Sequence, residues 1–285
     1  MSEGVNSESK SQDSTRIVSL LNKEISLSKK PIEDVLGDER VLKIPSGDVI
    51  ERGKLFLEAF GGGEEELKKL EGYRVIVAPD DLYGRLGYSD IQEDFFSGIE
   101  SAKDLVSDAL LKASLLMLKR IDSSAGVCNK KEKLIVVRKA EDEEAIKRTI
   151  DHELLHAMAD RNDGGSGFQR ETEDSHDLNE AMVEIMEMSN TYNKSARELA
   201  EALVNGEIEL VENRMEDVAP LLSLMVIAAE GEESISIRKM AKYYWKGDED
   251  SLLSLLSDKV KTEREAGLSQ DILELLSKLN DSVKT

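Results

Sequence analysis

One short stretch restricts both the local structure and the chemistry of this chain: His152-Glu153-Leu154-Leu155-His156. Residues four apart lie above one another on one face of an α-helix, so the two imidazoles can point at a single metal ion. Glu153 lies to the side, where its carboxylate can take a proton from a water held by that metal. The chain has three histidines in all, which makes a chance pair around a glutamate uncommon. The pattern predicts a helix with two metal ligands, His152 and His156, and a base, Glu153.

A catalytic zinc ion usually has three protein ligands and one open position, so a third ligand is expected elsewhere in the chain. Glu180 is the best candidate, because it shares one face of a predicted helix with Glu184. The other face is apolar and contains Leu178, Ala181, Met182, Ile185 and Met186. We expect Glu180 to reach the metal, and Glu184, one turn later, to accept the remaining N–H of a ligating histidine. The alternatives are histidines that are merely solvated or hydrogen-bonded, and glutamates that are ordinary surface residues.

HELLH followed by Asn179-Glu180-Ala181-Met182-Val183-Glu184 resembles the gluzincin branch of the zincin metallopeptidases, the thermolysin-like group. The resemblance implies that His152, His156 and Glu180 are zinc ligands, that Glu153 is the general base, and that Glu184 holds a ligating histidine. The metzincin pattern fits poorly, because the position six after His156 is Asn162 and not a histidine.

This resemblance implies a zinc-dependent enzyme that hydrolyses peptide bonds, with a peptide or protein as its substrate. Zinc lowers the pKa of a bound water and polarises the scissile carbonyl, while Glu153 takes the water proton and passes it to the leaving amine. An alternative is a catalytically silent zincin-like module that binds or regulates a partner and keeps zinc as a structural ion. The intact Glu153 speaks against it, because a structural site needs no base. A third option is an interaction protein whose helical C-terminal lobe binds a partner.

His176 has three possible roles: a replacement for Glu180 at the metal, a group that stabilises the oxyanion of the tetrahedral intermediate, or a loop residue with neither role. Gluzincins often stabilise the oxyanion with a tyrosine or histidine. No tyrosine lies between His156 and Glu180, and Tyr192 is a weak candidate.

The composition limits the partners of the chain. Its net charge is −21, with 59 acidic against 38 basic residues, which argues against nucleic acid or an anionic membrane as the main partner. A basic peptide would be attracted, although an acidic balance also simply favours solubility. The single cysteine, Cys128, excludes an intramolecular disulfide. The polar N-terminus lacks a signal-peptide core, and no run of about 18 apolar residues occurs, so we expect a cytoplasmic protein.

We expect an α+β fold: a disordered tail over residues 1–14, a zincin-like N-terminal lobe with a small mixed sheet and the HELLH helix over 15–160, and an all-α C-terminal lobe over 161–285 that carries the third ligand. Leu134–Val137 is our candidate for a sheet edge that aligns an extended substrate, with an ordinary interior strand as the alternative.

The expected elements follow from periodicity and turn residues. Strands are expected at 73–78, and at 126–128 and 134–137 as a hairpin. Helices are expected near Ile17–Leu21, at 49–60 before the turn Gly61-Gly62-Gly63, at 64–70, from Phe95 to Ile121 after Asp90, and at 142–160. Residues 161–176 are expected to form a loop, followed by helices near 195–204, 216–229, 234–245, 249–258 and 269–279.

Overall fold

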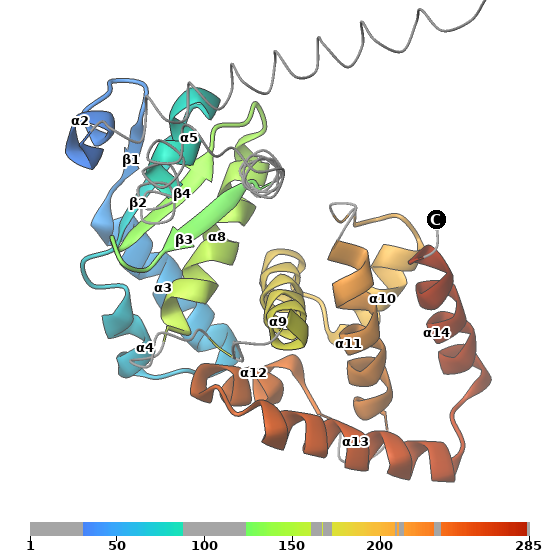
Figure 1. The fold of residues 1–285 in the computed structure, drawn as a ribbon. Coiled ribbons are helices and arrows are strands. Elements are labelled where there is room, and N and C mark those ends of the chain that lie inside the picture. Colours follow the sequence, from blue (N-terminus) through green and yellow to red (C-terminus); the bar gives the residue numbers. More distant parts are fainter. Residues whose placement is uncertain are drawn as a thin grey trace, which may run out of the picture. The chain divides into compact units, whose positions relative to one another are not determined.

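The computed structural model describes residues 31–87, 124–160, 167, 173–208, 210, 214–230 and 235–283, with the backbone alone for 173–176 (Figure 1). The chain divides into two compact units. Unit 1 combines residues 1–46 with 73–150, and unit 2 combines residues 47–72 with 151–285. The division therefore differs from the predicted one at residue 160, because 47–72 and the end of the HELLH helix group with the C-terminal helices.

Unit 1 is built on a four-stranded mixed sheet with the strand order β1-β2-β4-β3. Its strands are β1 (Leu42–Ile44), β2 (Arg74–Ala78), β3 (Gly126–Asn129) and β4 (Leu134–Arg138). β2 and β4 pair in parallel, while β1 and β3 are antiparallel to their neighbours. The predicted mixed sheet and the β3–β4 hairpin are both confirmed, and the hairpin turn includes Lys133 at a positive φ of 47°.

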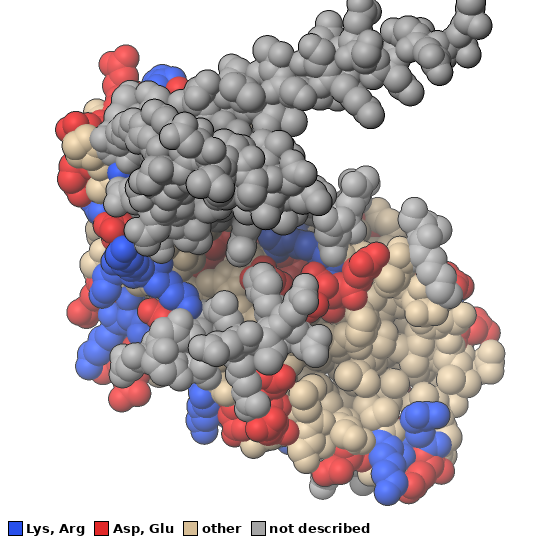
Figure 2. Space-filling model, viewed as in Figure 1, with Lys and Arg blue, Asp and Glu red and all other residues tan. Residues whose placement is uncertain are grey.

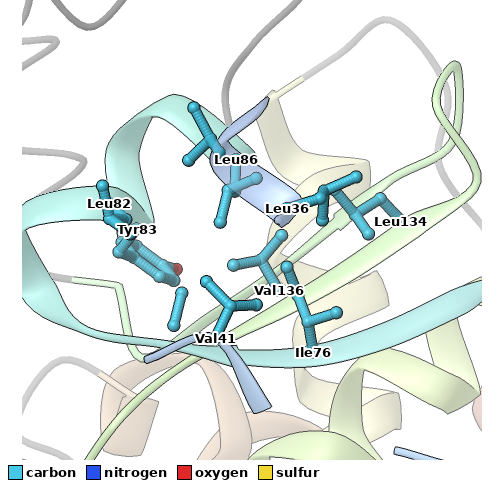
Figure 3. Close-up of a cluster of buried hydrophobic side chains, with 10 residues drawn as sticks. Leu36, Val41, Ile76, Leu82, Tyr83, Leu86, Leu134 and Val136 are labelled. Atoms are coloured by element: carbon cyan, nitrogen blue, oxygen red, sulfur yellow. The ribbon is translucent and has the colours of Figure 1, made fainter. Parts of the chain in front are cut away.

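The helices α2 (Ile32–Leu36) and α5 (Asp80–Gly87) pack against one face of this sheet. Alternate residues of β2 and β4, among them Ile76 and Val136, point into this layer and meet Tyr83 and Leu86 of α5 (Figure 3). The opposite residues of the same strands are also buried: Val75, Val77, Ile135 and Val137. Both faces of the central strand pair are therefore covered, which explains why β2 and β4 are apolar throughout rather than alternating.

β4 lies between β2 and β3, so the prediction of Leu134–Val137 as a substrate-aligning edge is wrong. An interior strand has both rows of backbone groups paired and cannot take up a further strand. Continuous apolar character is typical of a strand buried on both faces, and this signal in Leu134–Val137 indicates an interior position.

Several predicted segments lie outside the described residues: the tail 1–14, the helix near Ile17–Leu21 and the helix from Phe95 to Ile121 after Asp90. Three short elements were not predicted, namely α2, β1 and α5. The last follows Pro79, with Asp80 and Asp81 in its first turn, where acidic side chains favour a helix N-terminus. Pro79-Asp80-Asp81 therefore ends β2 and starts a helix at once.

Unit 2 is helical. Its elements are α3 (Ser46–Phe60, from Gly47 on), α4 (Glu64–Lys69), the end of α8 (Glu143–Met158), α9 (Glu173–Tyr192), α10 (Ala196–Val204), α11 (Arg214–Ala228), α12 (Ile237–Lys246), α13 (Glu249–Ala266) and α14 (Gln270–Ser282). The predicted all-α character of the C-terminal region is confirmed for the described residues. Four of these helices start at a side chain that caps a backbone N–H: Ser195, Ser236, Asp248 and Ser269.

α11 is the central helix of unit 2, because α9, α10, α13 and α14 all pack against it. Its sequence is apolar almost all round, which suits a helix surrounded by others. Pro220 lies within α11 and is exposed, so the missing N–H falls on the outer side of the helix. In the part of the chain that the structure describes, no helix is both long enough and apolar enough to cross a membrane.

Candidate metal centre

The HELLH residues lie in the last two turns of α8, in unit 2. The helix starts where Asp142 accepts a hydrogen bond from the backbone N–H of Glu144, and its first turn is acidic. Its C-terminal part is buried on all sides: from 151 to 159 every residue is buried. His152, Glu153 and His156 are therefore interior residues and not members of a solvated helix face.

Two imidazole nitrogens and both oxygens of one carboxylate converge between α8 and α9. His152 Nε2 lies 3.2 Å from His156 Nε2 and 3.2 Å from Glu180 Oε2, and His156 Nε2 lies 3.1 Å from Glu180 Oε1. These atoms form a possible metal-binding group of His152, His156 and Glu180. The structure thus brings together the three residues predicted as ligands.

The spacing of this group suits zinc. Ligands at about 2.0–2.2 Å in a tetrahedral arrangement lie about 3.3–3.6 Å from one another. The two imidazole nitrogens are 3.2 Å apart, and each lies 3.1–3.2 Å from one oxygen of Glu180. Two imidazole nitrogens facing each other at 3.2 Å repel unless a proton or a cation lies between them. Two imidazoles and one carboxylate also match a common donor set of catalytic zinc.

The far side of His152 is held by two charged residues. Its Nδ1 lies 3.3 Å from Glu184 Oε2, as expected for a carboxylate that fixes the tautomer of a ligating histidine. Arg214, the first residue of α11, donates from Nη1 to the same oxygen at 2.5 Å. That Nη1 is 3.1 Å from Nδ1 and 3.3 Å from Nε2 of His152. An atom almost equidistant from both ring nitrogens lies along neither lone pair. Arg214 therefore donates its hydrogen bond to Glu184, and Glu184 is the acceptor for Nδ1–H of His152.

The far side of His156 faces Asn179. The amide Nδ2 of Asn179 lies 3.3 Å from Nδ1 of His156, and its Oδ1 is buried without a hydrogen-bond partner among the described residues. A histidine that binds metal through Nε2 carries its proton on Nδ1 and needs an acceptor there. A half-turn of the amide, whose two ends have nearly the same shape, supplies Oδ1 as that acceptor. The orphaned oxygen thus finds a partner when His156 is a metal ligand.

Burial and neighbouring charges shift the pKa of four groups in the centre: His152, Glu153, Glu180 and Glu184. Burial and the Arg214 guanidinium lower the pKa of His152, but hydrogen bonds to Glu180 and Glu184 outweigh them and raise it to about 9. Burial alone would raise the pKa of Glu180 and Glu184. The two histidines hold the pKa of Glu180 well below its usual range, and His152 and Arg214 bring the pKa of Glu184 to about 2. Burial raises the pKa of Glu153, which makes its carboxylate a stronger base.

No family model, curated protein or solved structure matches this chain. The gluzincin resemblance therefore rests on the HELLH and NEAMVE motifs.

Two further residues were considered from sequence, His176 and Tyr192. His176 belongs to the backbone of α9 and not to the predicted loop 161–176, and its side chain is outside the described part. Tyr192 is at the end of α9, 12 positions after Glu180 (192 − 180), which is about 18 Å along a helix. Tyr192 is therefore too far from the ligand atoms to stabilise an oxyanion there.

Sequence reasoning missed two residues of the centre. Asn179 is part of the NEAMVE motif, directly before Glu180. Each ligating histidine needs an acceptor for its Nδ1–H, and this requirement could have identified Asn179 as the acceptor for His156. Arg214 lies 62 positions after His152 and has no neighbouring motif, so nothing local in the sequence points to it. Its position depends on how α11 packs against α9.

Proposed function

We propose that this chain is a zinc-dependent metallopeptidase whose metal ligands are His152, His156 and Glu180. The supporting observation is the convergence of His152, His156 and Glu180, whose nitrogens and carboxylate oxygens lie 3.1–3.2 Å from one another in pairs, beside the buried carboxylate of Glu153. A purely structural metal site would need the ligands but not an additional buried base in the same turn of helix. We also propose that the small mixed sheet followed by the HELLH helix corresponds to a zincin-like lobe.

The residues of this centre have distinct roles in the proposed peptide hydrolysis. When bound, zinc would supply a Lewis acid that polarises the scissile carbonyl and acidifies the attacking water. Glu153 accepts the proton of this water and delivers it to the leaving amine. Glu184 and Asn179 orient the ligating imidazoles through their Nδ1 atoms, and Arg214 keeps Glu184 ionised and in place.

The first experiment is the zinc content of the purified protein, compared between the parent and Glu180→Ala. One zinc per chain in the parent and sharply reduced affinity in the variant would support the proposed ligand set. A parent that holds no zinc after reconstitution would overturn it. Zinc held equally by both proteins would exclude Glu180 as a ligand and point to another residue, His176 among them.

The second experiment separates enzyme from binding module. The zinc-loaded parent is incubated with a diverse peptide library, and cleavage products are read by mass spectrometry beside Glu153→Gln. We expect cleavage by the parent, none by the variant, and equal zinc content in both, because the introduced amide fills the same volume as the carboxylate without acting as a base. Stable zinc without cleavage of any peptide would favour the silent zincin-like module, and undiminished cleavage by Glu153→Gln would remove the assigned role of this residue.

A further inference from the structure

Helix α12 of unit 2 has a charge opposite to that of the whole chain. It contains four basic residues and no acidic one, in a chain with 59 acidic and 38 basic residues. The apolar side of α12 is buried and contains Ile237, Met240, Ala241, Tyr244 and Trp245. Its exposed side carries the cations, which we call the basic face of α12: Arg238, Lys239, Lys242 and Lys246.

No carboxylate among the described residues forms an ion pair with the basic face of α12. Five other cations of unit 2 do pair with an acidic side chain: Arg52, Lys54, Arg197, Arg214 and Lys259. Figure 2 shows patches of both signs on the face in view, so local charge can differ from the net charge. Arg238, Lys242 and Lys246 also repeat every four residues, and like charges at this spacing destabilise a helix. The repulsion among these like charges destabilises the helix, and no ion pair within the described part of the chain offsets it.

A surface cavity adjoins the N-terminal end of this face. It has a volume of about 560 Å³ and lies where α10 and α12 begin and α9 ends. Arg238 lines it, and the same side chain packs over the backbone of Gly61. Apolar side chains form part of the wall: Ala59, Phe60, Ala196, Ala229, Ile235 and Ile237. Among the described residues of the wall, the one carboxylate is Glu230, which is paired with Arg197. The cavity can take one apolar side chain next to Arg238.

These features favour one class of partner over two others. A membrane surface would require exposed apolar residues on α12, whose apolar side is buried in unit 2. The net charge of −21 would repel the phosphates of a nucleic acid, and binding of phosphates would leave the partly apolar cavity unfilled. An acidic peptide segment with one apolar residue matches both the cations and the cavity.

We propose that the basic face of α12 and its adjoining cavity dock an acidic peptide segment of a partner protein. Carboxylates pair with Arg238, Lys242 and Lys246, which span about 12 Å of helix, and an apolar side chain enters the cavity. The proposal is independent of zinc and of hydrolysis, because none of these residues contacts the metal ligands in unit 2.

The test uses the full chain and a fluorescein-labelled peptide of glutamates with one leucine at its end. Its affinity is measured by fluorescence anisotropy at several salt concentrations, beside a twin peptide with glutamines in place of the glutamates and another with serine in place of leucine. We expect binding of the glutamate peptide that weakens with salt, weaker binding of the serine peptide, and no binding of the glutamine peptide. Equal affinity for the leucine and serine peptides would remove the cavity from the proposal.

Two triple variants with the same loss of charge locate the site. Arg238→Gln/Lys242→Gln/Lys246→Gln removes the basic face, and Lys68→Gln/Lys261→Gln/Lys278→Gln removes three exposed lysines elsewhere. We expect about a tenfold loss of affinity for the first and less than about twofold for the second, with unchanged circular dichroism for both. Equal losses, or no binding by the parent, would overturn the proposal. Tighter binding of duplex DNA or phosphatidylserine vesicles at this face would also overturn it, as would self-association of the parent that the first variant abolishes.

Discussion

The Oε2 atom of Glu184 lies 3.3 Å from Nδ1 of His152, on the nitrogen opposite to the one that faces Glu180. One imidazole therefore connects two carboxylates that are one helical turn apart on α9. Glu180 lies at the metal position, and Glu184 determines which ring nitrogen carries the proton. We expect Glu184→Ala to weaken zinc binding by about 10–100-fold, measured by competition with a chromophoric chelator. Glu184→Gln should lose less, because its amide oxygen still accepts from Nδ1. Parent-like affinity in Glu184→Ala would contradict this role.

Asn179 should act on His156 through its oxygen and not through its nitrogen. Asn179→Asp keeps an oxygen beside His156 Nδ1, whereas Asn179→Leu keeps the volume and removes every acceptor. We expect Asn179→Asp to bind zinc about as well as the parent and Asn179→Leu to bind it about 10–100-fold more weakly. The same chelator competition measures both. If Asn179→Asp loses as much affinity as Asn179→Leu, the amide nitrogen is the required group.

The metal-free protein should be most stable between about pH 4.5 and pH 6.5. The pKa of His152 rises from 6.5 to about 9 in the fold, so its stabilisation is fully present below pH 6.5 and is lost as the pH rises through 9. The pKa of Glu184 falls from 4.5 to about 2, so its stabilisation is present above pH 4.5 and is lost as the pH falls through 2. The thermal unfolding temperature of chelator-treated protein, measured from about pH 2 to pH 9, tests both the acid and the alkaline loss of stability. Absence of the alkaline decline would contradict the assignment to His152.

Zinc binding should release one proton from His152 below about pH 9. A protonated imidazole cannot bind metal, so the apparent affinity should rise about tenfold per pH unit between pH 6.5 and 9 and then level off. Proton release on zinc addition is measured in weakly buffered solution with an indicator dye. An affinity that is flat across this range would show that His152 is already neutral in the metal-free protein.

The ligand set could be predicted because each half of it is local. His152 and His156 depend on helical spacing alone, and so do Glu180 and Glu184. The structure places both pairs on helices and brings three of the four side chains together. The contacts across longer separations could not be predicted in this way, since Arg214 reaches Glu184 through the packing of α11 on α9.

In the fold as well, features that depend on local sequence could be predicted, and features that depend on contacts between distant segments could not. The helices of unit 2 follow periodicity and caps such as Ser195 and Ser236, and they were predicted closely, although α13 continues eight residues beyond the predicted 258, to Ala266. Strand order depends on pairing between distant segments, and for this reason the edge assignment of Leu134–Val137 was wrong. The grouping of residues 47–72 with the C-terminal helices likewise depends on tertiary packing.

Gly167 should be intolerant of a side chain because of its position against Asn179. Its φ is +52°, and a Cβ there would lie 2.1 Å from the Tyr244 ring and 2.5 Å from Asn179 Oδ1. Gly167→Ala must displace one of them, and we expect a loss of about 2–4 kcal/mol in unfolding free energy with weaker zinc binding. Gly206 is the matched control, since its φ is +70° and a Cβ would meet nothing within 4 Å. Gly206→Ala should lose only about 1–2 kcal/mol and keep parent-like zinc affinity. Equal effects would mean that the close approach is unimportant.

The ion pair between Arg52 and Asp151 should stabilise unit 2 next to the first metal ligand. Arg52 of α3 donates from Nε and Nη2 to both oxygens of Asp151 at 2.7 and 2.8 Å. The Asp151 side chain is 8% exposed and that of Arg52 26%, whereas the Lys54–Glu51 pair on the same helix is largely exposed.

We expect Asp151→Ala to cost about 2–4 kcal/mol in denaturant unfolding, because it removes the carboxylate that pairs with the partly buried guanidinium of Arg52. Glu51→Ala, the control, should cost less than about 1 kcal/mol. Arg52→Met/Asp151→Leu should recover most of the loss, because an apolar pair avoids the desolvation of both charges. A double variant as unstable as Asp151→Ala would instead show that the bidentate geometry itself is needed to hold α3 against the start of the HELLH segment.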